Sequence, residues 1–248
     1  WAGYMSENNS FGVSSMTDSL KKVAMLKPPQ ALISADPEKW HYGKSFDPLK
    51  IRSNYKAFTE ILTDSEVEIL WMEPKSNNIA DSVFTYDASF MTQEGAVLLS
   101  PGKVLRKGEV LIHDDFYKKQ DIPIIGRLQG DAKAEGGDMF WMDRNNLIVG
   151  KGFRTNQSGI DQLRSILGSI GANVFCFDLP VFKGSEACLH MMSLISLVDN
   201  KKALAKTSLL PVSLLQLLEK KGFCIIDAPE DEFFSSESLS INVLSISP

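Results

Sequence analysis

The amino-acid sequence predicts an α/β fold built from a repeated unit of strand, turn, strand, helix and strand. Two observations lead to this prediction. Apolar runs of strand length alternate with stretches whose apolar residues recur with the helical period. The same order of elements returns about every 50 residues, beginning near positions 22, 83, 139, 190 and 241. Sequence identity between the copies is slight, so the repetition is one of architecture.

Strands are expected wherever a short apolar run is bounded by polar or turn-forming residues. Such runs lie at 22–26, 68–72, 83–91, 96–100, 139–142, 147–149, 173–177, 194–198, 223–226 and 241–246. Helices are expected at 51–62, 157–167 and 212–220. Asn156 can cap the second of these helices, and Pro211 stands at the start of the third. Gly171 and Gly222 follow helices and lead directly into strands.

The composition is that of a globular protein. Of the 248 residues, 44% are hydrophobic and 23% are charged, and the net charge is −5. Acidic and basic residues are mixed along the chain, which argues against a nucleic-acid-binding surface. No apolar run approaches the ~20 residues of a membrane helix, and no signal peptide is visible. The three cysteines lack metal-binding spacing, so we expect a reducing, cytoplasmic compartment.

The domain organisation follows from the repeats. We expect residues 1–21 to form an N-terminal extension and residues 22–248 to form a single domain, because no long linker or low-complexity stretch interrupts them. The first four copies of the unit are nearly whole, whereas the fifth contains one strand, at 241–247. We therefore expect that the domain lacks its C-terminal segment here.

Two acidic motifs stand beside expected strands. Glu135 and Asp138 flank two glycines directly before the strand at 139–142. Glycines permit close approach of a ligand, and the acids could bind a cation or act as acid and base; an ordinary Gly-Gly turn is the alternative. Asp81 and Asp87 similarly bracket an apolar pair, and exposed loop aspartates are the alternative there.

A basic residue and a histidine complete the set of candidates. Arg154 lies between a strand and a helix, where it could grip a carboxylate with two parallel hydrogen bonds or simply lie on the surface. His190 alone among the three histidines stands in an apolar run. A histidine there could be a core residue or a general acid and base near neutral pH.

The motifs in combination resemble a known family. Asp-x-Val-Phe-x-x-Asp at 81–87, Glu-Gly-Gly-Asp at 135–138, Gly-x-x-x-Arg-Thr-Asn at 150–156 and Leu-His-x-x-Ser at 189–193 occur in the order and spacing of dimethylarginine dimethylaminohydrolases. They also resemble the wider amidinotransferase and deiminase family. The resemblance runs from about residue 22 to the last residue. It implies a five-bladed α/β propeller (pentein) of ββαβ modules, with the fifth module truncated in this chain.

The resemblance also implies roles for individual residues. His190 would be the catalytic histidine, and Glu135 would hold the substrate's guanidinium beside it. Arg154 and Arg106 would lie near the substrate's α-carboxylate, whereas Asp81 and Asp87 would bind its cationic groups. The implied substrate-binding residues are Asp81, Asp87, Asp138, Arg106 and Arg154. If Glu135 and His190 act on one small substrate, their side chains should lie within about 12 Å of each other.

The chemistry of the family requires a cysteine nucleophile. A thiolate attacks the central guanidinium carbon and expels an amine, and histidine protonates the departing nitrogen and then activates water. The positions of Cys176, Cys188 and Cys224 do not match that of the family's cysteine, which follows the histidine by roughly a hundred residues. We therefore expect that the nucleophile is missing from this chain and that the 248-residue chain is inactive alone.

Two departures from the family pattern bear on the substrate. Met192 stands where relatives that hydrolyse free arginine usually carry an acid, which favours substituted guanidines or a less familiar branch of the family. Tyr86 stands where many dimethylargininases carry an acid. Amidino transfer to an amine and non-catalytic arginine binding remain alternatives to hydrolysis. No metal or organic cofactor is implied, a small guanidino compound is the expected ligand, and a homodimer is left open.

Overall fold

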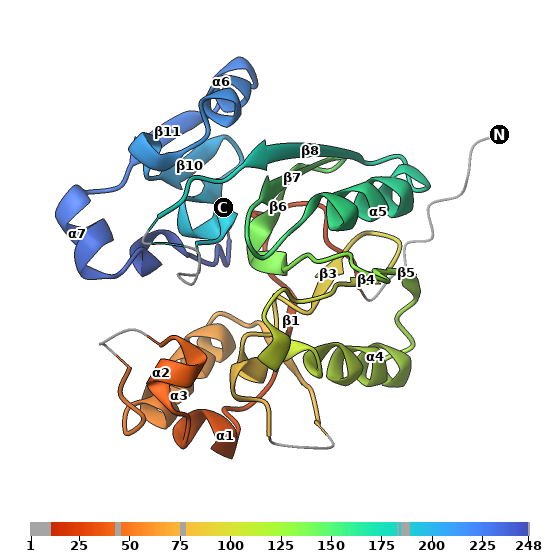
Figure 1. The fold of residues 1–248 in the computed structure, drawn as a ribbon, viewed down its shortest axis with the longest axis vertical. Helices are drawn as coiled ribbons and strands as arrows, with labels where there is room; N and C mark the ends of the chain where they lie inside the picture. Colours follow the sequence, from red (N-terminus) through yellow and green to blue (C-terminus); the bar gives the residue numbers. More distant parts are fainter. Residues whose placement is uncertain (1–10, 43–45, 75–77, 183, 185–188, 248) are drawn as a thin grey trace.

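The computed structural model describes residues 11–42, 46–74, 78–182, 184 and 189–247. These residues form four small β-sheets, one of two strands and three of three strands (Figure 1). Each three-stranded sheet belongs to one ββαβ module. The first of these modules contains β3 (Ser89–Met91), β4 (Ala96–Leu98), α4 (Glu109–Lys119) and β5 (Ile124–Arg127). The second contains β6 (Met139–Asp143), β7 (Asn146–Lys151), α5 (Gln157–Gly168) and β8 (Asn173–Asp178). The third contains β9 (Ile195–Asp199), β10 (Lys202–Ala205), α6 (Val212–Lys220) and β11 (Cys224–Asp227).

The strand pairing is the same in all three modules. The first two strands are antiparallel and joined by a short turn, and the third is parallel to the second because the helix returns the chain to the same end. The sheet orders β3-β4-β5, β6-β7-β8 and β11-β10-β9 therefore describe one repeated topology. This confirms the α/β repeat that the sequence predicts.

Local signals explain where the helices begin and where the next strands start. The Asn156 side chain accepts a hydrogen bond from the Gly159 backbone N–H at 2.8 Å, which caps the first turn of α5. Gly171 and Gly222 both have a φ of +78°, a conformation that favours glycine, and each turns the chain from a helix into β8 or β11.

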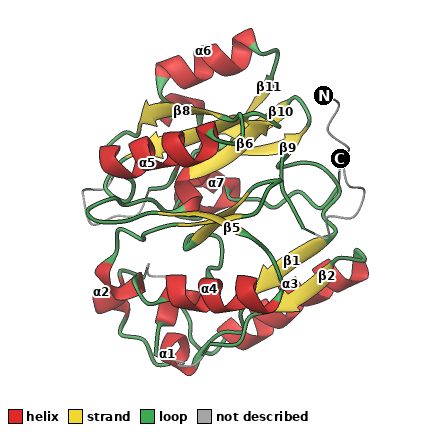
Figure 2. Cartoon of the chain, turned by 90° about the vertical axis from the view of Figure 1, so that its right-hand side faces the viewer, coloured by secondary structure: helices red, strands yellow, loops and turns green. Residues whose placement is uncertain are grey.

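The N-terminal part forms a smaller unit. β1 (Lys22–Met25) and β2 (Glu68–Trp71) pair in parallel, with α1 (Gln30–Ile33), α2 (Pro37–Trp40) and α3 (Ile51–Asp64) between them in sequence. Figure 2 shows β1, β2 and α1 to α4 in one half of the molecule and β6 with β8 to β11 in the other.

The module of β6, β7 and β8 contributes to two apolar clusters. Trp141, Leu147 and Val149 are buried and pack with Ile160 and Leu163 of α5. A second cluster joins Phe140 and Ile148 from the other face of this sheet to the module of β9, β10 and β11. Because apolar residues of β6 and β7 are buried on both faces, this sheet is the layer that holds neighbouring modules together.

Two expected strands differ in the structure. The segment 241–246 forms no strand within the described residues; Leu239–Ile241 is a 3₁₀ turn (η6), and the Ile246 carbonyl accepts a hydrogen bond from the Leu20 N–H. An apolar run needs a neighbouring backbone to become a strand. Of 83–91, only β3 is extended, because the chain before it turns through a 3₁₀ helix, Ala80–Val83 (η1). The sequence did not predict the helices α1 (Gln30–Ile33), α2 (Pro37–Trp40), α4 and α7 (Glu230–Ser235) or the strands β5 and β10.

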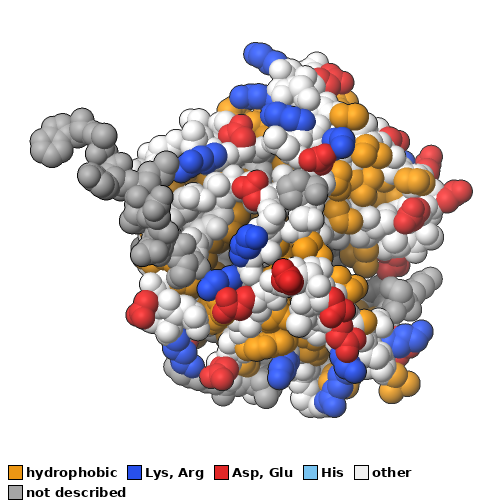
Figure 3. Space-filling view, turned by 180° about the vertical axis from the view of Figure 1, so that it is seen from behind, with side chains coloured by type: hydrophobic (Ala, Val, Ile, Leu, Met, Phe, Trp, Pro, Cys, Tyr) orange, Lys and Arg blue, Asp and Glu red, His pale blue; other side chains and the backbone are white. Residues whose placement is uncertain are grey.

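The surface carries both signs of charge. Figure 3 shows acidic and basic side chains interspersed with apolar ones over the face seen from behind. No helix among the described residues is long and apolar enough to cross a membrane.

Candidate active site

The candidate residues lie on corresponding parts of successive modules. Short 3₁₀ turns stand before or at the start of these modules: η1, η3 (Gly136–Asp138) and η4 (Met191–Ser193). Asp81 lies in η1, Asp138 lies in η3, and His190 immediately precedes η4. The turn η6 lies where the sequence predicts a fifth copy of the unit to begin. The repetition of the fold therefore brings one polar motif from each module toward a common point.

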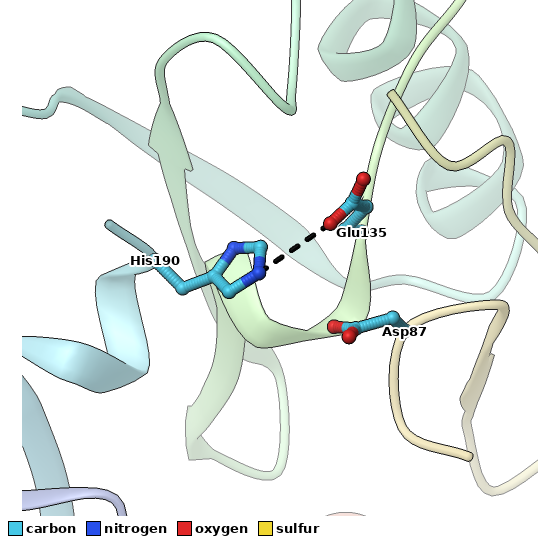
Figure 4. Close-up of side chains that lie close together, drawn as sticks. All are labelled: Asp87, Glu135 and His190. Atoms are coloured by element: carbon cyan, nitrogen blue, oxygen red, sulfur yellow. Dashed lines mark ion pairs between the residues drawn. The ribbon is translucent and has the colours of Figure 1, made fainter. Parts of the chain in front are cut away.

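His190 lies between two carboxylates. Its Nδ1 is 3.0 Å from Asp138 Oδ1. Its Nε2 is 3.4 Å from Glu135 Oε2, the contact drawn as a dashed line in Figure 4. An ionised carboxylate can only accept a hydrogen bond, so Nδ1 carries a proton and Nε2 is directed to Glu135. The expectation that Glu135 and His190 lie within about 12 Å of each other is confirmed.

Asp138 is itself held from both sides. Its Oδ2 accepts from the Thr155 hydroxyl at 2.7 Å, and its Oδ1 also accepts from the Met191 N–H at 3.2 Å. These contacts fix the orientation of the Asp138 carboxylate, and the carboxylate in turn fixes the orientation of the His190 ring.

Glu135 is completely buried and accepts hydrogen bonds from several donors. Its Oε1 accepts backbone hydrogen bonds from Gly102 at 2.8 Å and Lys103 at 3.3 Å. One nitrogen of the Arg154 guanidinium lies 2.9 Å from Oε1 and 3.1 Å from Oε2. The carboxylate is therefore charge-compensated and fixed beside the His190 ring.

Asp87 is the third carboxylate of the cluster. Its Oδ2 accepts from Arg106 Nη1 at 2.6 Å, and its Oδ1 accepts from the Gly137 N–H at 2.8 Å. Burial by itself would raise the pKa of Asp87, but the charges of Arg106 and His190 bring it below its usual value. Asp87 is therefore held as an anion whose charge is compensated by Arg106.

Arg106 differs from the expectation. It was expected to lie near a substrate carboxylate; in the structure its side chain is 5% exposed and faces carboxylates of the protein. Nε and Nη2 donate to the two oxygens of Glu109 at 2.8 and 2.7 Å, and Nη1 donates to Asp87. Burial would lower the pKa of Arg106, whereas Asp87 and Glu109 raise it above its usual value. The hydrogen bond from buried Arg106 therefore fixes the position of the Asp87 carboxylate.

Asp81 lies at the edge of the cluster. Its Oδ1 accepts from the Tyr42 hydroxyl at 2.6 Å, and its Oδ2 forms an ion pair with Lys103 Nζ at 2.8 Å. Its backbone carbonyl lies 3.4 Å from Arg106 Nη2, which connects it to the Asp87 group. Both of its oxygens therefore already have partners within the protein.

The two glycines of the Glu-Gly-Gly-Asp motif are required by close contacts. A Cβ added to Gly136 would overlap the Tyr86 carbonyl oxygen. One added to Gly137 would lie 2.9 Å from the His190 ring and 3.0 Å from Asp87 Oδ1. The motif therefore lets the histidine ring and Asp87 approach the backbone directly.

The cluster can hold a cation. Asp87, Glu135 and His190 offer ligand atoms that all lie within 4.8 Å of one another, a spacing compact enough for a metal ion. Two of these carboxylates, however, already contact planar guanidinium groups, Asp87 that of Arg106 and Glu135 that of Arg154. The donor set therefore suits a planar organic cation at least as well as a metal.

The structure places every predicted site residue in one network of contacts. Several partners were not predicted from sequence: Tyr42, Lys103, Glu109 and Thr155. Glu109 stands three residues after Arg106, a spacing that could have suggested an ion pair. Lys103 and Tyr42 offered no such signal, because each meets Asp81 across a long stretch of sequence.

The cysteines lie in other surroundings. Cys176 is on β8 and packs against the core of its module, and Cys224 is exposed on β11. Cys188 lies outside the described residues.

Comparison with known proteins supports the resemblance drawn from the motifs. A family model described as arginine deiminase matches residues 48–222, well over half of the chain. An uncharacterised Bacillus subtilis protein, YkgA, is 28% identical over 231 residues, which covers 92% of this chain and 76% of the relative. The N(G),N(G)-dimethylarginine dimethylaminohydrolase of Pseudomonas aeruginosa is 26% identical over 208 residues, which covers 84% of this chain and 76% of the relative.

A solved structure shows the same fold. It is a cysteine-to-serine mutant of the Pseudomonas aeruginosa enzyme in complex with citrulline. It matches with a TM-score of 0.69 at 24% identity, covering 86% of this chain and 78% of that chain. This likeness confirms the mixed α/β fold with small sheets, and the five-bladed arrangement stays a prediction.

Proposed function

Because the chain belongs to the arginine deiminase family, we propose that it provides the site for hydrolysis of the guanidino group of arginine or a substituted arginine. The reaction proceeds through a covalent intermediate on a cysteine thiolate. Water then releases a ureido product.

One observation carries this proposal. Glu135 binds a guanidinium, that of Arg154, with both carboxylate oxygens, and His190 Nε2 lies 3.4 Å from the same carboxylate. A substrate guanidinium in that position would have a nitrogen beside the imidazole. This is the arrangement that protonation of a leaving amine requires.

The residues divide the work as follows. Glu135 and Asp87 bind the cation and orient its plane, and Asp138 keeps Nδ1 of His190 protonated so that Nε2 performs the proton transfers. The C–S bond forms as the thiolate attacks, and the C–N bond breaks as His190 gives its proton to the amine. His190 then takes a proton from water, the C–O bond forms and the thiolate leaves.

The thiolate is not supplied by the cysteines whose surroundings are described. Cys176 packs against a module core and Cys224 is exposed on a different strand. The proposal therefore requires a thiol from outside the described residues. A labelling experiment with an electrophilic amidine, followed by peptide mass analysis, identifies it.

Substrate binding includes an exchange at Arg154. The Arg154 guanidinium forms an ion pair with Glu135 in the structure, so a substrate guanidinium that binds Glu135 must displace it. A substrate carboxylate gives the displaced arginine a new anionic partner, which keeps its charge compensated. Amino-acid-like guanidines are therefore favoured over guanidines without a carboxylate.

Two features support a substituted guanidine. Met192, which is buried, stands beside the site in place of an acid. Among the relatives, the Pseudomonas aeruginosa protein bears the name of a dimethylarginine hydrolase. We therefore place methylated arginines ahead of free arginine in the order of expected substrates.

Product analysis tests the proposal. The protein is incubated with arginine, dimethylarginine and agmatine, and the product mass and binding are measured. A ureido product supports hydrolysis, and a new guanidine formed on an added amine indicates amidino transfer. Binding without turnover indicates a binding protein only where the nucleophilic thiol is present; without that thiol, it is the result that the proposal itself expects. Glu135→Gln should weaken binding of all guanidines, whereas the exposed control Glu219→Gln should not. Absence of guanidine binding would refute the proposal.

A further inference from the structure

We propose that Thr155 is a positioning residue for His190, because its hydroxyl links the backbone of Glu135 to the carboxylate of Asp138. The link keeps the histidine in the tautomer that proton transfer at Nε2 needs, while Arg154 leaves Glu135 to admit a substrate. The inference rests on the proposed function and assigns a further residue to it.

The Thr155 hydroxyl uses both of its hydrogen-bonding roles inside the site. Its oxygen accepts the Glu135 N–H at 3.3 Å, and it donates to Asp138 Oδ2 at 2.7 Å. Thr155 and Glu135 are 0% exposed, and Asp138 is 1% exposed. A hydroxyl has one proton and a backbone N–H can only donate, so the proton of Thr155 must point to Asp138.

The direction of this proton determines how Asp138 presents its oxygens. Oδ1 faces His190 Nδ1 and the Met191 N–H, whereas the donor that the described residues provide to Oδ2 is the Thr155 hydroxyl. Without that donor, a buried carboxylate oxygen would lose its hydrogen bond, which is costly. The carboxylate would then turn to share its remaining donors, and Nδ1 of the histidine would lose its fixed acceptor.

Thr155 and Arg154 are neighbours in sequence and hold the two carboxylates that flank the histidine. Arg154 pairs with the Glu135 side chain, and Thr155 bonds Asp138. The Arg154 side chain is 17% exposed, whereas Thr155 is fully buried and is followed directly by Asn156, the cap of α5. Arg154 can therefore exchange with a substrate guanidinium while Thr155 keeps its contacts.

The tautomer of His190 tests the inference without a substrate. The full 248-residue chain, with ¹⁵N-labelled histidine, is examined by NMR at a pH where the ring is neutral. The wild-type ring should carry its proton on Nδ1. Thr155→Val keeps the shape of the side chain without the hydroxyl and should give a mixture of the two tautomers, whereas Thr155→Ser should restore the wild-type signal.

A buried threonine elsewhere in the fold is the matched control. Thr92 is 0% exposed, its hydroxyl donates to the Gly95 carbonyl at 2.8 Å, and its oxygen accepts the Glu94 N–H at 3.1 Å. Thr92→Val removes the same number of hydrogen bonds as Thr155→Val, so the two variants should lower Tm by similar amounts. Thr92→Val should leave the His190 tautomer unchanged.

Kinetics give a second measurement where turnover occurs. Thr155→Val should lower kcat by about 10- to 100-fold, because the histidine no longer presents Nε2 to the leaving nitrogen. KM should change by less than about threefold, because Glu135 and Arg154 keep their side chains. Thr155→Ser and Thr92→Val should keep kcat near the wild-type value.

The outcomes separate this inference from the proposed function. A wild-type ring protonated on Nε2, or an unchanged tautomer in Thr155→Val, overturns the inference and leaves guanidine binding and hydrolysis untouched. If Thr155→Val does not fold, Thr155→Ala takes its place, and the wild-type tautomer still decides. Failure of guanidines to bind overturns the proposed function, whereas the tautomer is measured independently of it.

Discussion

The His190 ring and the backbone of Met191 share one oxygen of Asp138. Oδ1 lies 3.0 Å from His190 Nδ1 and accepts the Met191 N–H at 3.2 Å. A single carboxylate thus sets both the ring and the start of η4, so the orientation of the histidine is built into the fold.

Replacing that carboxylate should change the chemistry more than the fold. In Asp138→Asn, the amide can present an N–H to Nδ1 and so favour the wrong tautomer of His190. We expect kcat to fall by about 10²- to 10⁴-fold with little change in binding. Asp121→Asn is the control, because Asp121 is exposed and has a φ of +53°, which asparagine tolerates. Wild-type turnover in Asp138→Asn would contradict this assignment.

Replacement of Gly136, Gly137 or Gly168 by alanine should have different effects on stability and on activity. Gly137→Ala places a methyl group 2.9 Å from the His190 ring, so it should displace the ring and abolish turnover at a cost of about 1–3 kcal/mol in stability. Gly136→Ala meets a backbone oxygen and should unfold the protein. Gly168→Ala, which meets nothing within 4 Å, should keep both stability and activity. Thermal unfolding and assays of the three variants decide.

Arg106 should matter for stability as well as for binding. Arg106→Ala leaves Asp87 and Glu109 buried without their cation, which should cost about 3–5 kcal/mol of unfolding free energy. Arg106→Lys keeps the charge but loses the paired hydrogen bonds to Glu109, so an intermediate loss is expected. Arg164→Lys, in an exposed ion pair, should cost less than about 0.5 kcal/mol. Denaturant unfolding measures all three, and equal losses would contradict the prediction.

Arg154 should act chiefly on binding. If it receives the substrate carboxylate, Arg154→Ala should raise KM about 10- to 100-fold with a smaller change in kcat. Asp87→Ala should also lower kcat, because the guanidinium would be misoriented. Arg144→Ala, at an exposed position in the turn between β6 and β7, is the control. Unchanged ligand binding in both Arg154→Ala and Asp87→Ala would remove these residues from the site.

His113 should make stability depend on pH. Burial, together with the charge of Arg106, lowers the pKa of His113 from 6.5 to about 4, and its Nδ1 bonds Ser89 Oγ at 2.8 Å. Between these pH values the unfolded chain binds more protons than the folded protein. The free energy of unfolding should therefore fall as the pH falls from 6.5 to 4, by up to about 3 kcal/mol.

A variant isolates this contribution. His113→Asn removes the titrating group and should flatten the pH dependence in that window, whereas His41→Asn, at an exposed position, should not. Denaturant unfolding at several pH values measures the slope. An unchanged slope in His113→Asn would assign the effect to other groups.

The sequence by itself determined the repeated unit and most of its elements. The α6 helix was predicted with its observed bounds, and β1, β6 and α5 agree within a residue or two. These are local features, since periodicity, caps and turn glycines act between residues close in sequence. The motifs that meet at His190 were identifiable for the same reason, because each is a short segment.

Only the tertiary structure decided how the charges are paired. Asp81 meets Lys103 and Tyr42, and Arg106 turns toward Asp87 instead of outward, because partners are selected by packing between modules. The segment 241–246 shows the same limit, since its apolar pattern suits a strand but no described strand pairs with it. The sequence pattern of a segment determines which of its faces is apolar, whereas the tertiary fold determines which neighbouring element covers that face.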